Sequence, residues 1–191
     1  MKKSSPTPSD PDAVAPIAVP ADVAAPYKER DATPAEMRAL GHGLRWRILR
    51  ITLNKSMTNK QIAERLGRDP GTILHHVKVL VREGFLAPEG VRSGKRGAHE
   101  IPYRATGKSW RIRLKPDAGN AAAILDAVRE EVTEMGDDAA VTTLRLGVRL
   151  KPDDLAELKR RIVAIGAEFE PLDDASGEPI GLLAVVHRRR P

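Results

Sequence analysis

Apolar residues recur at helical spacing through the middle of this chain of 191 residues. In the segment LRWRILRITL, Leu44, Ile48 and Ile51 lie at positions i, i+4 and i+7, which is the repeat of one face of a helix. An earlier helix is predicted to begin after Thr33, because Thr33 with Glu36 three residues later is a capping-box signature. The pattern therefore predicts two consecutive helices.

Two further short helices are predicted directly downstream. TNKQIAERLG has Thr58 as its N-cap and ends at Gly67, and GRDPGTILHHVKVLVREG begins after the cap Asp69 and ends at Gly84. The buried stripe of the second helix is predicted to consist of Ile73, Val77 and Leu80. Two short helices joined by a tight turn that contains glycine form a helix-turn-helix.

The pattern changes from helical to alternating after Gly84. FLAPEGVRSGKRGAHEIPYRAT predicts a strand from Phe85, a basic tip with Arg92, Lys95 and Arg96, and a return strand. Pro102 in the return strand suggests an edge strand, which leaves an amide position facing solvent. A hairpin directly after a helix-turn-helix is a wing.

The last part of the chain mixes both periods. NAAAILDAVREEV predicts a helix whose apolar stripe, Ile124, Leu125, Val128 and Val132, packs against the helix within residues 43–54. KPDDLAELKRRIVAIGAEF predicts another helix. TTLRLGVRL alternates as a strand does, and IGLLAVVHR is nearly continuously apolar. We therefore expect an α+β fold, in which a winged helix-turn-helix is followed by a small C-terminal α/β unit with the order helix, strand, helix, strand.

Composition divides the chain into three parts and excludes several classes of protein. We expect a disordered Pro/Ala-rich tail at 1–32, a DNA-binding domain at 33–115 and a C-terminal unit at 116–191. Cysteine is absent, which excludes disulfides and thiolate metal ligands. No apolar run is long enough to span a bilayer, and the N-terminal residues lack the apolar stretch of a signal peptide, so we expect a soluble, cytoplasmic protein without a membrane partner.

Charge is distributed unevenly along the chain. Residues 28–115 carry 20 Lys/Arg and 8 Asp/Glu, a net charge of +12, whereas residues 116–191 carry 10 and 15, a net charge of −5. A basic module joined to an acidic one is typical of a protein in which one part meets a polyanion. Arginines that only solvate helix faces are the alternative, and composition alone does not separate the two.

The segments LGHGLRWRILRITL, TNKQIAERLGRDPGTILHHVKVLVREGFL and HEIPYRAT together resemble the winged helix-turn-helix of ArsR-type bacterial transcription regulators. The resemblance covers about residues 34–106, and it implies that the helix after Asp69 is the recognition helix. It does not transfer an operator sequence, since the reading positions of this chain differ from those of many relatives. The predicted DNA contacts are Thr58, Asn59 and Lys60, then Pro70, Gly71, Thr72, Leu74, His75 and Lys78, and in the wing Arg92, Lys95 and Arg96.

The residues predicted on the open side of the recognition helix suit DNA contact unevenly. Thr72 can hydrogen-bond a phosphate or a base, His75 can meet a purine edge, Leu74 can touch a thymine methyl, and Lys78 is a phosphate contact. The adjacent pair His75 and His76 diverges by about 100 degrees on a helix, so both cannot ligate one ion from the same face. We expect His76 to cap or pack against the neighbouring helix, with purely structural histidines as the alternative.

Signatures of catalysis and of metal binding are weak in this sequence. No phosphate loop, nucleophile elbow or paired histidine motif occurs, and the acidic pairs are explained by capping and solvation, so we expect no enzyme, no metal and no cofactor. The expected protein is a dimeric regulator of double-stranded DNA that represses by obstructing a promoter. The C-terminal unit is assigned first to homodimerisation, with a small-molecule effector or a protein partner left open. A winged-helix scaffold that meets an acidic protein is the rival interpretation.

Overall fold

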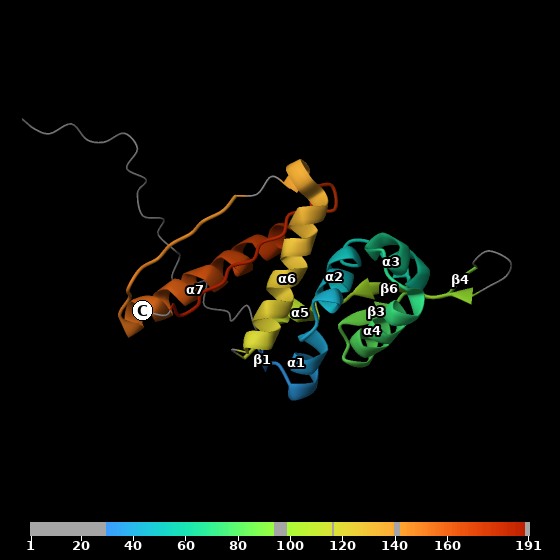
Figure 1. Ribbon diagram of the computed structural model, residues 1–191, viewed down its shortest axis with the longest axis horizontal. Helices are drawn as coiled ribbons and strands as arrows, with labels where there is room; N and C mark the ends of the chain where they lie inside the picture. Colours follow the sequence, from blue (N-terminus) through green and yellow to red (C-terminus); the bar gives the residue numbers. More distant parts are fainter. Residues whose placement is uncertain (1–29, 94–98, 116, 140–141, 190–191) are drawn as a thin grey trace, which may run out of the picture. The chain divides into compact units, whose positions relative to one another are not determined.

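The computed structural model describes residues 30–93, 99–115, 117–139 and 142–189 (Figure 1). The chain divides into two compact units. One comprises residues 26–149 with 174–179, and the other comprises residues 1–25, 150–173 and 180–191. Helices and short strands occur together, and the expected α+β class is confirmed. Within the described ranges, no helix combines the length and the apolar character that crossing a membrane requires.

The larger unit begins with a two-residue strand, β1 (Arg30–Asp31), that pairs in parallel with β7 (Ile112–Arg113). We expected residues 30–32 to belong to a disordered tail, but the structure places them in the fold, and Ala32 is buried. The pairing is held by Arg113, whose Nε donates to Asp31 Oδ1 over 2.6 Å. The remainder of the predicted tail lies outside the described residues.

The predicted pair of N-terminal helices is present. Helix α1 (Pro34–Leu40) has the full capping box, because Thr33 Oγ1 accepts from the amide of Glu36 and the Glu36 carboxylate accepts from the amide of Thr33. Helix α2 (Gly43–Ile51) begins after His42, whose Nδ1 accepts from the amide of Leu44. These local bonds satisfy amides that the helix starts leave unpaired.

The helix-turn-helix is formed by α3 (Asn59–Leu66) and α4 (Pro70–Arg82). Gly67 ends α3 at φ +59°, a left-handed conformation that glycine adopts without strain. The Asp69 carboxylate caps α4 by accepting from the amide of Thr72 at 2.9 Å. The predicted stripe of α4 is confirmed, since all three residues are fully buried; they are Ile73, Val77 and Leu80.

A three-stranded antiparallel sheet of order β2–β6–β3 closes the unit; its strands are β2 (Met57–Thr58), β3 (Leu86–Pro88) and β6 (Pro102–Ala105). The hairpin that follows the helix-turn-helix is present, with Leu86 opposite Ala105. The expectation that Pro102 marks an edge strand was wrong, because β6 is the central strand. Pro102 is tolerated there as the first residue of its strand.

The hairpin extends outward through β4 (Arg92–Ser93) and β5 (His99–Glu100), which pair in antiparallel register. Figure 1 shows β4 projecting away from α3 and α4. This is the position of a wing. The predicted tip residues Lys95 and Arg96 lie outside the described residues.

Two elements follow the sheet: the short helix α5 (Lys108–Arg111), which leads into β7, and the long helix α6 (Ala118–Met135), which is followed by a 3-10 turn, Gly136–Ala139. This long helix packs against α2 as predicted, but its buried side carries Ala123 and Ala127, whereas Leu125 and Val132 of the predicted stripe are exposed. Arg47 of α2 is 6% exposed and forms ion pairs with Glu130, at 2.7 Å, and with Glu134 of α6. Arg50 adds a third pair to Glu131 at 3.0 Å.

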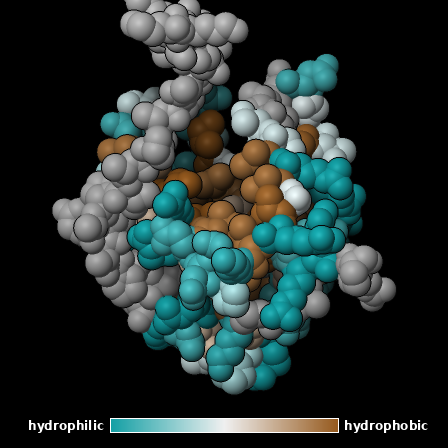
Figure 2. Space-filling view, turned by 90° about the vertical axis from the view of Figure 1, so that its left-hand side faces the viewer, coloured by the Kyte–Doolittle hydropathy of each residue, from teal (hydrophilic) through white to brown (hydrophobic). Residues whose placement is uncertain are grey.

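The smaller unit contains the predicted helix α7 (Pro152–Phe169), after which the turn Glu170–Leu172 follows. The two expected strands are not formed: residues 142–150 and 178–189 have no strand hydrogen bonds. An alternating pattern becomes a strand only beside a partner strand, and these described segments have none. Their apolar residues are therefore exposed, with Leu144 at 90% and Ile180 at 74%. Figure 2 shows apolar side chains, in brown, exposed at the surface.

Candidate DNA-binding face

Helix α4 presents two sharply different sides. While its aliphatic stripe is buried, six predicted contact residues on the other side are exposed: Pro70, Gly71, Thr72, Leu74, His75 and Lys78. The exposed set is concentrated in the first two turns of the helix, where a recognition helix presents side chains to base edges. The structure therefore brings these predicted residues onto one surface.

The predicted residues at the start of α3 serve the turn itself. Thr58 is buried, and its hydroxyl accepts from the amide of Gln61. The amide nitrogen Nδ2 of Asn59 donates to the backbone oxygen of Pro70 at 2.9 Å, which ties the start of α3 to the start of α4. Lys60 is exposed, with Glu64 at 3.9 Å. Of these three side chains, that of Lys60 is the one open to a phosphate.

The histidine pair is divided between the inside and the outside of the unit. His75 is exposed, whereas His76 is 6% exposed and accepts a hydrogen bond at Nδ1 from Arg45 Nε at 3.1 Å. The rings of His42 and His76 lie 4.6 Å apart. The expectation that His76 packs against the neighbouring helix is confirmed. Among the described residues, no group of three or more potential ligands is arranged to hold a metal ion.

His76 is held in its neutral form. Burial, the nearby charge of His42 and that of Arg45 lower the pKa of His76 to about 4. Burial and then the charge of Arg45 also lower the pKa of His42. Since Nδ1 of His76 accepts from Arg45, the ring carries its proton on Nε2. This neutral acceptor links α4 to α2, next to the edge of the exposed surface.

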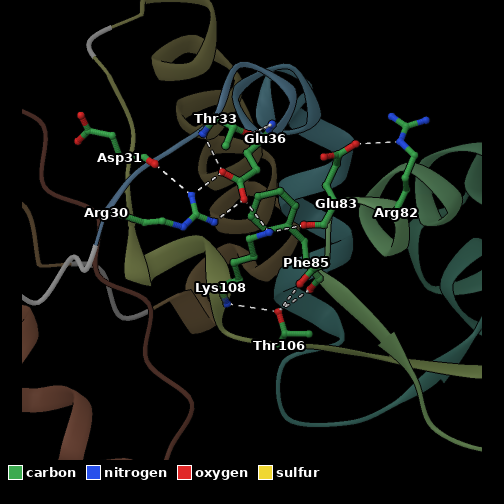
Figure 3. Close-up of polar contacts among 10 residues, drawn as sticks. Arg30, Asp31, Thr33, Glu36, Arg82, Glu83, Phe85, Thr106 and Lys108 are labelled. Atoms are coloured by element: carbon green, nitrogen blue, oxygen red, sulfur yellow. Dashed lines mark hydrogen bonds and ion pairs between the residues drawn. The ribbon is translucent and has the colours of Figure 1, made fainter.

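A buried carboxylate fixes the other end of α4 (Figure 3). Glu36 is 4% exposed and accepts from Arg30 at 2.6 and 2.8 Å, while Lys108 Nζ lies 2.7 Å from its Oε1. The Arg30 guanidinium and Lys108 hold the pKa of this carboxyl well below its usual range. Lys108 also donates to the backbone oxygen of Glu83, the residue that ends α4, and lies 5.0 Å from the centre of the Phe85 ring.

This cluster joins segments distant in the sequence. Arg30 comes from β1, Glu36 from α1 and Lys108 from α5, after the wing. In the same region Thr106 donates from its hydroxyl to the backbone oxygen of Gly84 at 2.8 Å. The C-terminal end of α4 is thus bonded to the return strand of the wing and to α1, so the recognition helix and the wing are positioned together.

One basic residue on the open side of α4 was missed. Arg82 lies seven residues after His75 and four after Lys78, and therefore on the same face. Its side chain is 70% exposed and forms an ion pair with Glu83 at 2.8 Å. Helical spacing in the sequence indicates this position, but the predicted contacts extend no further along the helix than Lys78.

The match to a family model agrees with this geometry. Residues 43–87 match a family model described as winged helix-turn-helix DNA-binding, so this segment is of the type that binds double-stranded DNA. Two solved structures of Lactococcus lactis ZitR, a cysteine-to-serine mutant and an apo form of a double mutant, are 16% and 17% identical. Each covers 66% of this chain, the matches span 74% and 82% of those chains, and the TM-scores are 0.33 and 0.32. A search of curated proteins finds no match.

Proposed function

We propose that the protein is a sequence-specific transcription regulator of double-stranded DNA, similar in type to ArsR regulators and acting in the cytoplasm as a repressor by promoter occlusion. The observation that carries the proposal is the division of α4, with its aliphatic stripe fully buried and its first two turns exposed beside a wing. In this proposal the protein is not an enzyme, because its described side chains serve binding and positioning.

Roles follow from the placement of each side chain. Lys78 and Lys60 are exposed cations that attract phosphates at any sequence, and their contribution weakens as salt rises. His75 and Leu74, on the open side of α4, meet base edges and methyl groups in the major groove. Arg92 belongs to the wing, which reaches the flanking backbone or minor groove.

The proposed regulator is a homodimer, because reading two half-sites requires a two-fold axis. Helix α6 supports this assembly. On the side away from α2, this helix carries apolar residues at positions 125, 128, 132 and 135, which form one stripe along the helix. Three of them are exposed: Leu125 at 45%, Val132 at 38% and Met135 at 51%. We expect Leu125→Glu with Val132→Glu to halve the mass measured by light scattering from twice 20.8 kDa to 20.8 kDa.

The test of function is selection from random and genomic duplex DNA by the full chain at two salt concentrations. A pseudo-palindrome whose half-site centres lie about one helical turn apart is expected, and its enrichment should survive the higher salt. His75→Ala is expected to change the selected sequence, while Lys78→Gln should weaken all duplexes alike. Lys159→Gln, an exposed lysine of α7, is the matched control.

Two results would contradict the proposal. Enrichment of no sequence, with binding that disappears as salt rises, leaves only non-specific attraction between charges. Equal binding by wild type and both α4 variants would show that this surface does not read DNA. In either case the rival interpretation, a winged-helix scaffold for an acidic protein, becomes the better explanation.

A further inference from the structure

An open hollow of about 480 Å³ lies beside the C-terminal half of α4, between that helix, α1 and the start of α2. Its apolar lining includes Ala39 and Val79. Its charged lining consists of Arg38, Arg45, Arg82 and Glu83. Three guanidinium groups therefore share one hollow with a single carboxylate, and the ion pair between Arg82 and Glu83 seen in Figure 3 accounts for that carboxylate.

Arg45 is held ready for a ligand. Its Nε donates to His76 Nδ1 at 3.1 Å, and its Nη1 donates to the backbone oxygens of Arg38 at 3.0 Å and Ala39 at 2.9 Å. A guanidinium has five N–H groups, and these bonds account for three of them. The two N–H groups on Nη2 have no hydrogen-bond acceptor within the described part of the chain, so a fixed, half-buried cation is left with free donors.

The other cations increase the positive charge of the hollow. The side chain of Arg38 forms no ion pair with any described residue, and it is exposed. Arg38, Arg45 and Arg82 all line the hollow, so like charges converge there, and burial and then the positive charge of Arg82 lower the pKa of Arg45. Such convergence costs free energy that a bound anion offsets, and guanidinium groups bind phosphate oxygens through paired N–H bonds.

The position of the hollow identifies the source of the phosphate. Arg82 and Val79 belong to the last turns of the same helix whose first turns are exposed for base contact, and Arg82 lies on the face of His75 and Lys78. A duplex bound along this face would extend past Arg82 toward the hollow. We propose, on the basis of the proposed function, that Arg38, Arg45 and Arg82 form a phosphate-binding site that holds the DNA backbone beside the recognition helix.

The first experiment measures how DNA affinity depends on salt. Arg38→Gln and Arg82→Gln are the test variants, and Arg129→Gln, an exposed arginine of α6 that is 71% exposed beside Asp126, is the control. Each lost phosphate contact should reduce the slope of log affinity against log salt by about 1, for specific and non-specific duplexes alike. The affinity ratio of wild type to variant should then shrink about 3.5-fold between 50 and 200 mM salt. An unchanged slope overturns the assignment to DNA.

The second experiment uses inorganic phosphate on the DNA-free protein, with sodium chloride at equal ionic strength as the control. The melting temperature is followed by tryptophan fluorescence in wild type and in the double variant Arg38→Gln, Arg82→Gln. Stabilisation specific to phosphate and confined to wild type, together with an unchanged DNA slope, assigns the site to a free phosphate compound and overturns the role in DNA binding. No effect in either experiment overturns the site. If wild type binds no duplex, the proposed function fails, while the phosphate titration still tests the hollow.

Discussion

Replacing His76 with glutamine should flatten the dependence of folding stability on pH between pH 7 and pH 5. His76 has an ordinary pKa of 6.5 when unfolded and about 4 in the folded chain. Between these values the unfolded chain binds a proton that the folded chain does not, so stability rises with pH through this window and is lost as pH falls. His76→Gln removes the titrating group and keeps an oxygen that can accept from Arg45 Nε.

The size of the effect follows from the two pKa values. At pH 7 the unfolded histidine is mostly neutral, so the lowered pKa of His76 reduces the free energy of unfolding by only about 0.2 kcal/mol. At pH 5 the unfolded ring is almost fully protonated while the folded ring is not, and the cost reaches about 2 kcal/mol. The charges that face His76 are those of Arg45 on α2, His42 before α2 and His75 on α4 itself. The pKa of His42 is lowered as well, so wild type includes a second contribution of the same sign.

Urea unfolding followed by tryptophan fluorescence measures this free energy. Trp46 and Trp110 are the two tryptophans of the chain, and both lie in the unit that contains His76. Above pH 5 the carboxyl groups with lowered pKa, such as that of Glu36, contribute little to the slope, because they and their unfolded counterparts are both ionised there.

The matched control is His75→Gln, since His75 precedes His76 and its side chain is exposed. We expect this control to keep most of the wild-type slope, because the charge of His75 is the smallest of the causes that lower the pKa of His76, and we expect His76→Gln to lose most of the slope. Parallel pH profiles for wild type and His76→Gln would refute the buried, neutral state of His76. A variant that unfolds at every pH would leave the slope unmeasured, and His76→Asn with a shorter acceptor then serves as the second test.

Three further predictions concern stability and are measured by the same urea titration. Glu36→Ala should destabilise the chain by about 3 kcal/mol, because it leaves Lys108 near a buried site without its carboxylate; a loss below about 1 kcal/mol would contradict the network. Arg47→Ala should cost about 1 kcal/mol, because the Glu130 and Glu134 carboxylates that it leaves unpaired are themselves partly exposed, and a neutral result would contradict its role in the α2–α6 contact. Asp69→Ala should cost about 1 kcal/mol through the lost cap of α4, and Asp69→Asn should restore most of it.

The helices and their ends were predictable from the sequence because the interactions that determine them are local. The capping box of Thr33 and Glu36 spans three residues, and Gly67 ends α3 through its own backbone angles. The buried stripe of α4 follows from a repeat within thirteen residues. For such features, the residues that decide the structure lie within one or two turns of each other.

Long-range partners were not predictable in this way. The pairing of Arg30 with Ile112 joins positions about eighty residues apart, and nothing near Arg30 indicates it. Strand β6 is central because β2 pairs with it on the side opposite β3. Strand β2 comes before the recognition helix in the sequence, so the hairpin alone does not indicate this pairing. The alternating segment around Leu146 carries a strand pattern, but the described part of this single chain supplies no partner strand, and local periodicity does not reveal that.

The histidine pair shows how a local pattern and a tertiary contact combine. Helical spacing predicts that His75 and His76 diverge, which decides that one faces outward and one inward. The role of the inward residue, His76, depends on Arg45, which lies thirty-one residues earlier and donates a hydrogen bond from its Nε to His76 Nδ1. Because that bond orients the Arg45 guanidinium toward the hollow, the buried histidine positions a cation beside the surface on which the exposed histidine lies. Two adjacent residues of the same type therefore serve one surface in different ways, the first by facing it and the second by holding the cation at its edge.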